Sequence, residues 1–465
     1  FVRFQASKKN NFTAGKVYEK VIQNERRGDY LGGTVQVIPH ITDEIKRRIK
    51  EAAKGADIAI VEIGGTVGDI ESQPFIEAIR QMMLELPSAN TALAHLTLVP
   101  YIQVSEELKT KPTQHSVKEL RSLGLQPDCL ICRLGKELPN DEKKKIALFC
   151  SVDPNSVISM HDVETVYSIP LLLYTQEVDK ILLKKLNLLK VKSPRLNDWK
   201  RVVDAKLNPK KKVTIAVVGK YVDLKDSYKS LNEALDHAGI VNLAKVEIHM
   251  IDAAKITSAN VSKVLKSYQA VLVPGGFGNR GIEGMIVACR FARENNLPYF
   301  GICLGMQIAI IEFSRNVLKL KNANSTEFNS KTKYPVIGLV TEWKDASGKI
   351  EHRNENSNLG GTMRLGGQKC LIKKSSLSYR LYKKLTVTER HRHRYEVNPE
   401  FKNKLISGGM DIVGTSLDGN LAEMIEIKKH PWFLGCQFHP EFTSNPRDGH
   451  PIFNDFISKA IKIKR

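Results

Sequence analysis

Residues 301–305, with the sequence Gly-Ile-Cys-Leu-Gly, place glycines two positions before and two positions after Cys303, and they follow the apolar segment 297–300. This pattern is typical of a buried strand that turns sharply into a helix and carries a nucleophile at the turn. The helix N-terminus would place unpaired backbone N–H groups beside the thiol and favour the thiolate. Because free cysteine also packs as a modest hydrophobe, this segment alone fits a buried residue at a strand end equally well.

Two further segments favour a cysteine nucleophile. Residues 432–442 predict a strand that ends in His-Pro-Glu, where His439 can act as a base and Glu441 can orient it. Residues 270–278 predict a buried strand that runs into a glycine turn, whose free N–H groups could stabilise an oxyanion. The chain order is therefore oxyanion loop, cysteine, then histidine and glutamate, which predicts Cys303, His439 and Glu441 as catalytic residues.

Together these segments resemble the class I glutamine amidotransferase domain, which cleaves the side-chain amide of glutamine through a cysteinyl thioester and releases ammonia. The resemblance becomes closer at residues 322–328, 359–366 and 389–396, which look like the glutaminase domain of the CTP synthase family. It implies that Glu327 binds the amino group of glutamine and that Arg394 binds its carboxylate, which suits their opposite charges. The resemblance implies that the rest of the glutamine pocket consists of Gly276, Leu304, Gly305, Met306 and Gln307.

Composition limits the class of protein. The chain has 465 residues, enough for two or more domains, and 42% hydrophobic with 26% charged residues excludes disorder as the main theme. No apolar run approaches the roughly 20 residues that span a bilayer, and the N-terminus has no signal-peptide pattern. Seven cysteines without framework spacing fit a reducing compartment better than a disulfide scaffold. We therefore expect a cytoplasmic enzyme with no membrane partner.

Cys129 and Cys132 have the spacing of a metal or dithiol pair. Residues 127–133, however, predict a short buried strand, on which positions three apart face opposite ways. No second such pair exists to complete a zinc site. We therefore expect both cysteines to be structural.

The formal charge of +21 and the basic clusters at 143–145, 210–212 and 391–394 are compatible with nucleic-acid binding. The clusters are dispersed, however, and no RRM, KH or zinc-finger pattern accompanies them. A lysine-rich solvated surface in a protein that handles triphosphates accounts for the charge. We expect small-molecule substrates and no nucleic-acid partner.

Two α/β halves are visible along the chain. Predicted buried strands alternate with helical patterns, which indicates two domains, each with a mainly parallel sheet covered by helices. The predicted strands of the first half lie at 56–63, 92–100 and 127–133, with helices at 76–86 and 116–123. The second half begins with a strand at 212–220 and a helix at 230–238, and it continues with strands near Val246, Val271 and Tyr299.

A linker is predicted between the halves. Ser193-Pro194 is a favourable helix start, with serine as cap and proline in the first turn, and Asn208-Pro209 would end that helix. We expect an amidoligase domain at 1–190, a linker helix at 191–211 and a glutamine amidotransferase domain at 212–465.

Two segments of the first half carry possible nucleotide chemistry. Residues 64–72 form a glycine-rich turn with carboxylates after the predicted strand at 56–63, where parallel sheets bind ligands. Residues 109–116 place two lysines and hydroxyls at a helix start, which favours a phosphate, although spacing alone fits a solvated helix entry slightly better.

Both segments resemble the amidoligase domain of the CTP synthase family, in which they recognise UTP and CTP. The resemblance implies a pyrimidine-nucleotide site made of Asp69, Ile70, Glu71, Lys109, Thr110, Lys111, Pro112, Thr113, Gln114 and Lys145. It also implies that Glu62 holds Mg²⁺ and that His161, Asp162 and Val163 touch the adenine of ATP. In the implied reaction ATP phosphorylates O4 of UTP and ammonia displaces that phosphate at C4, while magnesium and lysines offset the charge.

The sequence departs from that family at its beginning. The family has an N-terminal segment with a phosphate-binding glycine loop and a metal-sharing aspartate, and no G-x-x-x-x-G-K-[ST] occurs in these 465 residues. The chain also begins at Phe1 without methionine. We therefore expect a P-loop-type amidoligase domain that lacks its N-terminal part, in a chain that hydrolyses glutamine weakly without making CTP. Formation of CTP from UTP, ATP and ammonia by this chain would contradict that expectation.

Two other functions stay open. A stand-alone glutaminase or γ-glutamyl hydrolase would use Cys303 and His439 without needing residues 1–190. A basic nucleic-acid-binding or scaffold protein with a vestigial signature would leave three ordered segments unexplained. The family resemblance further implies a homotetramer and GTP as an allosteric activator, with Arg353 as a candidate contact.

Overall fold

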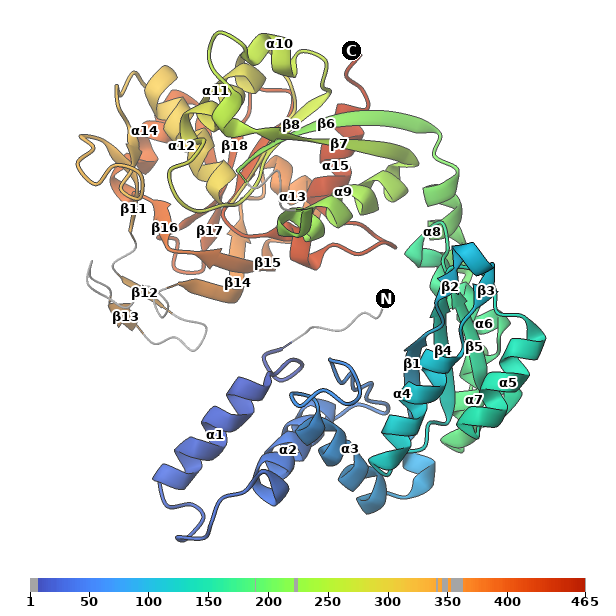
Figure 1. The fold of residues 1–465 in the computed structure, drawn as a ribbon. Coiled ribbons are helices and arrows are strands. Elements are labelled where there is room, and N and C mark those ends of the chain that lie inside the picture. The colour runs from blue at the N-terminus through green and yellow to red at the C-terminus, as the bar shows by residue number, and fades with distance from the viewer. Residues whose placement is uncertain are drawn as a thin grey trace. The chain divides into compact units, whose positions relative to one another are not determined.

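The computed structural model describes residues 7–188, 190–220, 225–339, 342–344, 350–352 and 363–464. The chain divides into two compact units, residues 1–200 and 201–465, and the division falls inside helix α8 (Asn197–Leu207) (Figure 1). This helix ends before Asn208 as predicted, but it does not begin at Ser193-Pro194, because residues 191–196 are not helical. A proline is compatible with a first helical turn without causing one, and the observed first turn instead carries Asp198.

The first unit contains a small parallel sheet and two groups of helices. Its elements are α1 (Ala14–Arg26), α2 (Thr42–Ala53), α3 (Gln73–Glu85), β1 (Ala94–Leu98), β2 (Tyr101–Ile102), β3 (Glu107–Leu108), α4 (Lys111–Ser122), β4 (Cys129–Leu134), α5 (Asn140–Cys150), β5 (Val157–His161), α6 (Ile169–Thr175) and α7 (Val178–Lys185). The parallel sheet has the order β1-β4-β5. Helices α4 and α5 cover one face and α6 and α7 the other, as parallel sheets require.

The strand predicted at 56–63 does not form. Its backbone is irregular, and Ile58 and Ile60 are 56% and 93% exposed. A strand needs a partner for its backbone N–H and C=O groups, and among the described residues no strand pairs with this segment. Strand β1 consequently lies at a sheet edge, with Leu96 and Leu98 exposed. The glycine-rich turn at 64–72 therefore does not follow a strand end.

Cys129 and Cys132 lie on β4 as predicted. Cys129 packs with α7 on one face of the sheet, whereas Cys132 packs with α5 on the other. Both are free thiols, and burial raises their pKa, that of Cys129 to about 11. The pair is structural, and the two sulfurs face different layers.

The second unit is larger. Its elements are β6 (Lys211–Gly219), α9 (Lys229–Asn242), β7 (Ala244–Asp252), α10 (Val261–Leu265), β8 (Ala270–Val273), α11 (Ile282–Glu294), β9 (Tyr299–Ile302), α12 (Leu304–Asn316), β10 (Asn324–Ser325), β11 (Pro335–Leu339), β12 (Glu342–Lys344), β13 (Ile350–His352), β14 (Arg364–Ile372), α13 (Leu377–Tyr382), β15 (Thr386–His393), β16 (Tyr395–Val397), α14 (Lys402–Gly408), β17 (Met410–Ser416), β18 (Ala422–Ile427), β19 (Phe433–Cys436) and α15 (Pro451–Ala460).

A nine-stranded sheet with the order β15-β14-β17-β18-β19-β9-β8-β6-β7 forms the centre of this unit. Strands β19, β9, β8, β6 and β7 are parallel neighbours, whereas β15, β14, β17, β18 and β19 pair antiparallel. The predicted parallel sheet is confirmed for the strands from β19 to β7, whereas the antiparallel strands from β15 to β18 were not predicted. Successive strands β17, β18 and β19 are joined by short connections, which permit antiparallel pairing only.

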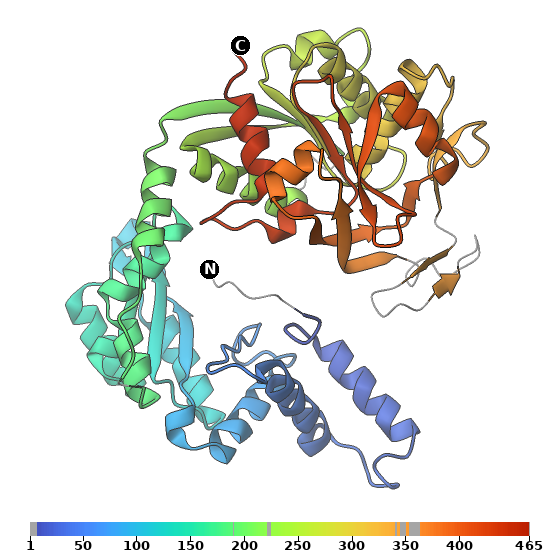
Figure 2. The same ribbon diagram turned by 180° about the vertical axis from the view of Figure 1, so that it is seen from behind.

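Helices cover both faces of the sheet (Figures 1 and 2). Alternate residues of β8 point to opposite cores: Val271 and Val273 pack with α11 and α12, whereas Ala270 and Leu272 pack with α9 and α15. All four are fully buried, so the strand is a continuous apolar run.

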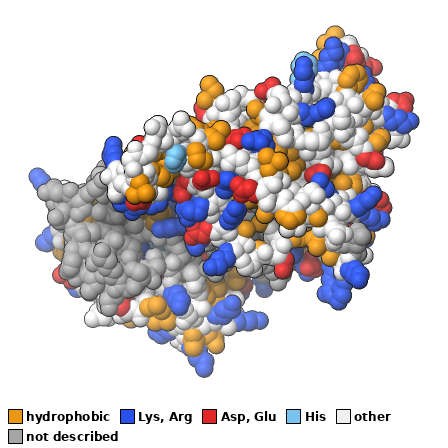
Figure 3. Space-filling view, turned by 90° about the horizontal axis from the view of Figure 1, so that it is seen from below, with side chains coloured by type: hydrophobic (Ala, Val, Ile, Leu, Met, Phe, Trp, Pro, Cys, Tyr) orange, Lys and Arg blue, Asp and Glu red, His pale blue; other side chains and the backbone are white. Residues whose placement is uncertain are grey.

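The surface charge is dispersed. On the face seen in Figure 3, Lys and Arg side chains lie among Asp, Glu and apolar side chains and do not form one stripe. No helix within the described ranges combines the length and apolar character that crossing a bilayer requires.

The turn between β9 and α12 is built as the glycine pattern predicts, with one difference. Cys303 itself has the left-handed backbone, with φ 52° and ψ −101°. The flanking glycines are needed for close packing: a Cβ on Gly301 would lie 2.5 Å from the backbone of Gly305, and a Cβ on Gly305 would lie 2.0 Å from the carbonyl oxygen of Val273. The missing side chains let α12 pack against β8 and β9.

We predict that Gly305→Ala lowers the free energy of unfolding by about 3 kcal/mol or more, because the new methyl group meets rigid backbone. Gly338→Ala is the matched control: its Cβ would meet nothing within 4 Å, and we expect a change below about 1 kcal/mol. Urea denaturation of the two variants measures both values. Equal stability of the two variants would contradict the packing argument.

Candidate active site

Neighbouring strands bring Cys303 and His439 to one edge of the sheet. Strand β19 pairs in parallel with β9, with Cys436 opposite Ile302, so the residues that follow both strands lie side by side. The Cys303 N–H donates to the carbonyl of Cys436 over 2.7 Å, and the His439 N–H donates to the carbonyl of Arg390 over 2.8 Å. These backbone bonds hold both turns in place.

The third residue completes a chain of polar contacts. Nδ1 of His439 lies 2.8 Å from Oε1 of Glu441, and both side chains are largely buried. Burial lowers the pKa of His439, but the Cys303 thiolate, together with hydrogen bonds to that sulfur and to Glu441, outweighs burial and raises the pKa to about 10. The imidazole is therefore an imidazolium at neutral pH.

A glycine loop forms the wall opposite the thiol. It follows β8, the other parallel neighbour of β9, and spans residues 274–278. A Cβ on Gly275 would lie 2.8 Å from Cε1 of His439 and 3.6 Å from Cβ of Cys303. Only a residue without a side chain lets this loop approach Cys303 and His439 so closely.

A buried lysine holds this loop through hydrogen bonds to the loop backbone. Lys220, at the end of β6, is 2% exposed, and its Nζ donates to the carbonyl of Phe277 over 3.3 Å and to that of Gly278. Arg280 in turn donates to the carbonyl of Lys220. Burial lowers the pKa of Lys220 to about 8, against the opposing charge of Glu327. This lysine was not singled out from the sequence, in which it follows β6 without a motif.

A small pocket opens beside the sulfur. The residues that line it include one carboxylate, Glu327, and one guanidinium, Arg394. Its lining consists of Gly276, Phe277, Cys303, Leu304, Gln307, Glu327, His393, Arg394 and Tyr395.

Glu327 and Arg394 provide the charges of the pocket. Glu327 accepts a hydrogen bond from the Gly278 N–H over 3.2 Å. Burial raises the pKa of Glu327, whereas the Gly278 N–H, Lys220 and Arg394 act in the opposite direction. Nε of Arg394 is buried and has no hydrogen-bond partner among the described residues. A ligand with a cationic and an anionic end matches these two side chains.

Two glutamines connect the pocket to the sulfur. Gln307 donates to the Tyr395 carbonyl over 3.0 Å and to Oε1 of Gln437 over 3.3 Å. Gln437 in turn lies 3.6 Å from Sγ of Cys303 and donates to it.

The predicted glutamine-binding residues fall into two groups. Gly276, Leu304, Gln307, Glu327 and Arg394 line the pocket. Gly305 packs against β8, and the Met306 side chain is buried in the core beside α11. Phe277, His393 and Tyr395 also line the pocket and were not predicted. The alternation of His and Arg at 391–394 on one strand could have indicated that the His393 side chain points inward.

In the first unit, two predicted segments meet at one sheet edge. Lys111 and Pro112 form the first turn of α4, and the Thr113 hydroxyl donates to the Leu98 carbonyl at the end of β1 over 3.1 Å. His161 ends β5, and the Asp162 N–H donates to the Leu134 carbonyl at the end of β4 over 3.0 Å. Since the three strands are parallel, both segments lie at their carboxyl edge, where such sheets bind ligands.

The lysines and polar residues near that edge have local partners. Lys109 pairs with Glu107 at 2.6 Å, and the Gln114 amide donates to the Thr110 hydroxyl over 3.1 Å. Lys145 lies on α5, 3.5 Å from Glu142. Val163 follows β5.

The other predicted residues lie elsewhere. The turn that carries Asp69, Ile70 and Glu71 is exposed and packs against the C-terminal half of α4, since Gly68 lies against Glu119. Glu62, the predicted magnesium ligand, is exposed in the irregular segment. Within the described part of the chain no group of three His, Cys, Asp or Glu side chains is placed to hold a metal ion.

We predict that Cys303 reacts with iodoacetamide at pH 6, where an ordinary cysteine with a pKa of about 8.5 is almost entirely protonated. Because the imidazolium of His439, with a pKa of about 10, persists from pH 6 to pH 9, we expect its charge to favour a thiolate at Cys303 throughout this range. The rate should therefore be nearly constant over this range in the wild type. In His439→Gln it should rise about tenfold per pH unit below the thiol pKa. A wild-type rate that rises as steeply would contradict the ion pair.

Both units match known families. Residues 1–188 match the family model of the CTP synthase N-terminus, and residues 223–459 match that of class I glutamine amidotransferase. The N-terminal match runs from the first residue, and it does not confirm the expectation that this domain lacks its N-terminal part.

Solved structures similar to this chain are glutamine-processing proteins. The glutaminase domain of Trypanosoma brucei CTPS with bound acivicin is 37% identical, with a TM-score of 0.49, over 54% of this chain and 95% of that one. Glutamine amidotransferases from Methylobacillus flagellatus and Thermotoga maritima are each 10% identical, with TM-scores of 0.30 and 0.29. They cover 50% and 54% of this chain, and 70% and 96% of their own.

The site geometry and the family matches agree. A cysteine at a strand-to-helix turn lies beside a histidine and a glutamate in the part of the chain that the amidotransferase model matches. The chain therefore belongs to the class I glutamine amidotransferase family and carries a CTP synthase N-terminal domain ahead of its amidotransferase domain.

Proposed function

We propose that this protein is a CTP synthase, in which the second unit releases ammonia from glutamine and the first unit uses it to aminate UTP at the expense of ATP. The observation that carries this proposal is the arrangement of Cys303, His439 and Glu441 beside a pocket with one acidic and one basic wall residue. The CTP synthase N-terminal domain in the same chain supports a synthase over a glutaminase alone.

In the proposed hydrolysis, the Cys303 thiolate attacks the side-chain amide carbon of glutamine. The tetrahedral oxyanion accepts hydrogen bonds from the loop at 274–278 and the first turn of α12. His439 gives its proton to the departing nitrogen, so that ammonia leaves and a thioester remains. His439 then takes a proton from water, hydroxide attacks the thioester, and glutamate leaves as the thiolate returns. Glu441 keeps the imidazole oriented throughout.

Glutamine recognition uses the two charged walls of the pocket. Arg394, with its buried Nε directed at no described acceptor, would bind the α-carboxylate, and Glu327 would bind the α-amino group. Burial raises the pKa of Glu327, and the charges of Lys220 and Arg394 oppose this rise. An ammonium group bound beside Glu327 would oppose it further.

The synthase half of the proposal is drawn from the family. UTP and CTP would bind at Asp69–Glu71, Lys109–Gln114 and Lys145, and the adenine of ATP would lie at His161–Val163. Magnesium with Glu62, a homotetramer, a cytoplasmic location and activation by GTP belong to the same proposal. Arg353, the candidate GTP contact, lies outside the described residues.

We predict that Cys303→Ala abolishes release of glutamate from glutamine, by a factor of about 10³ or more, because it removes the nucleophile. Cys289→Ala, which changes a buried cysteine on α11, should stay within about threefold of the wild type. Enzymatic assay of free glutamate measures both. Residual hydrolysis by Cys303→Ala above one tenth of the wild-type rate would contradict the assignment.

UTP binding separates a synthase from a stand-alone hydrolase. We expect the chain to bind UTP, and Lys111→Ala to weaken binding about tenfold through loss of a charge at the helix start. Lys118→Ala on the exposed side of the same helix is the matched control, with little expected change. Isothermal titration calorimetry measures both. Absence of UTP binding, with glutaminase activity intact, would favour the hydrolase.

A further inference from the structure

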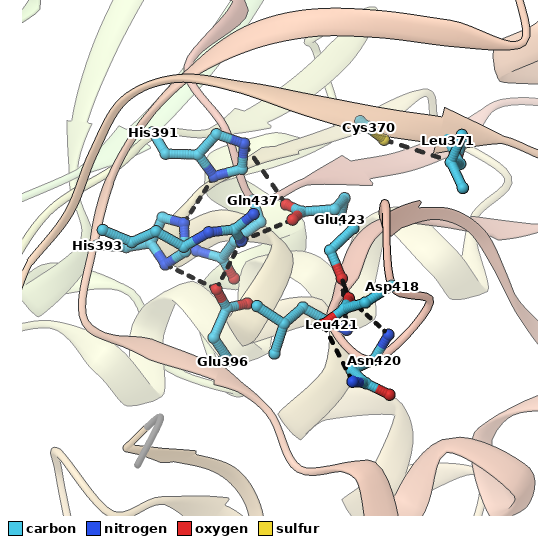
Figure 4. Close-up of polar contacts among 12 residues, drawn as sticks. Cys370, Leu371, His391, His393, Glu396, Asp418, Asn420, Leu421, Glu423 and Gln437 are labelled. Carbon is cyan, nitrogen blue, oxygen red and sulfur yellow. Dashed lines mark hydrogen bonds and ion pairs between the residues drawn. The ribbon is translucent and has the colours of Figure 1, made fainter. Parts of the chain in front are cut away.

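Gln437 is a buried polar residue that has no part in the hydrolysis described above. It directly follows strand β19 and lies among polar side chains that include His393 and Glu423 (Figure 4). Its Nε2 donates a hydrogen bond to Sγ of Cys303 over 3.6 Å. In the proposed hydrolysis this sulfur attacks the substrate, so the contact places a neutral N–H donor on the nucleophile itself.

Backbone hydrogen bonds to both neighbouring segments hold Gln437 at the sulfur. The Cys436 carbonyl accepts from the Cys303 N–H over 2.7 Å, and the Gln437 N–H donates to the Glu423 carbonyl over 2.9 Å. These two groups belong to the one peptide unit that joins Cys436 to Gln437. The unit is therefore bonded on both sides, towards β9 and towards β18, which fixes the point from which the Gln437 side chain extends.

The orientation of the Gln437 amide follows from a chain of hydrogen bonds. The oxygen and the nitrogen of an amide have nearly the same shape, so their partners decide which is which. The Gln307 amide contacts the Tyr395 carbonyl over 3.0 Å, and because a carbonyl only accepts, the contacting atom is Nε2. The same nitrogen lies 3.3 Å from the Gln437 amide, whose contacting atom is therefore the acceptor Oε1. Nε2 of Gln437 is thus the atom that faces the sulfur.

We propose that Gln437 is a further catalytic residue of this site, whose side-chain N–H donates to the Cys303 sulfur and stabilises the thiolate. Gln307 acts through it as a positioning residue that keeps the Gln437 amide turned toward the sulfur. A hydrogen bond to a charged acceptor is stronger than one between neutral groups, so this donor favours the thiolate over the thiol. The effect on turnover rests on the proposed function.

Burial strengthens the contact. Gln307 is 3% exposed and Gln437 is 0% exposed, so water does not compete for the two amides. In such a place of low dielectric, a hydrogen bond to a charge is stronger than it is in water. The donor is also permanent: His439 gains and loses a proton during the proposed hydrolysis, whereas Gln437 keeps its N–H at every stage.

The contact suits the last step of the proposed hydrolysis. In the thioester the sulfur carries no negative charge and is a weak acceptor. After hydroxide has added to the thioester carbon, the C–S bond breaks and its electron pair returns to the sulfur. The Gln437 N–H stabilises this departing thiolate. Gln437 is not among the described residues that line the pocket, so we expect its loss to lower kcat rather than substrate affinity.

Alkylation of Cys303 in a His439→Gln background tests the donor directly. Loss of the imidazolium moves the change from thiol to thiolate into the pH range of the folded protein. Gln437→Met keeps the length of the side chain and removes the N–H. We expect it to raise the alkylation midpoint, the pH of half-maximal reaction with iodoacetamide, by about one unit, because the thiolate loses a charge-assisted hydrogen bond. A rise of less than about 0.3 of a unit would overturn the proposal.

Gln269→Met in the same background is the matched control. Gln269 precedes β8, at the end of the strand remote from the sulfur, and its half-buried amide bonds the Thr214 N–H and the Ile463 carbonyl. The same chemical change there should leave the alkylation midpoint unmoved. The other titratable and charged groups around the sulfur and the pocket cancel within each comparison; they are Glu441, Cys436, Glu327, Arg394 and His393.

Gln307→Met tests the positioning role. In the same background it should raise the alkylation midpoint by less than Gln437→Met does, because the Gln437 amide keeps its N–H and loses only its fixed orientation. When Gln437→Met is already present, Gln307→Met should add no further rise, since it acts through that amide. Additive rises would overturn the chain of hydrogen bonds from Tyr395 to the sulfur.

Turnover separates a role on the sulfur from a role in binding. In the otherwise wild-type protein, Gln437→Met should lower kcat for glutamine about tenfold and leave KM within about threefold. A raised KM with unchanged kcat would overturn the proposal.

A measurement that does not need a folded Gln437 variant uses the wild type and Cys303→Ala. In ¹H–¹⁵N spectra, the side-chain amide of Gln437 should shift on Cys303→Ala, because it loses its acceptor, whereas that of Gln269 should not. An unmoved Gln437 amide would overturn the proposal. Neither this spectrum nor the alkylation requires glutamine. If the wild type hydrolysed no glutamine, the proposed function would fail, whereas the spectrum and the alkylation midpoint would still decide whether Gln437 donates to the sulfur.

Discussion

The parallel pairing of β9 with β8 on one side and with β19 on the other is the constraint on which the active site depends. Parallel strands end at the same edge of a sheet, so the three segments that follow them meet there. The meeting is close because Gly275, Gly301 and Gly305 have no side chains at the points of contact. A thiol, an imidazole and a loop of backbone donors are thereby brought together, although His439 lies more than a hundred residues after both Cys303 and the loop.

The chemistry of the site depends on charges held away from water. The imidazolium of His439 is stable because interactions with Cys303 and Glu441 raise its pKa by more than burial lowers it. Lys220 is buried behind the glycine loop, where its ammonium group orders two carbonyls. Each of these buried charged groups contacts specific partner atoms, and these contacts fix the position of its side chain.

The first unit follows the same topological rule with fewer strands. Its three parallel strands bring the helix start at Lys111 and the segment after His161 to one carboxyl edge. The apolar residues at 58–61 have the composition of a buried strand but are exposed, because the described residues offer them no neighbouring strand. An apolar composition favours burial of a segment, but a strand forms only where a neighbouring strand pairs with it.

The sequence by itself determined the local elements and the chemical groups. These are the strand-to-helix turn at Cys303, the His-Pro-Glu segment, the glycine loop and the opposite orientation of the Cys129 and Cys132 side chains on their strand. These features follow from short-range patterns in the sequence: the positions of glycines, the runs of apolar residues and the two-residue period of a strand. Only the tertiary structure decided the antiparallel half of the large sheet, the irregular course of residues 56–63 and the later start of α8. It also revealed Lys220 and its contacts with the glycine loop, because contacts between distant segments leave no local pattern in a single chain.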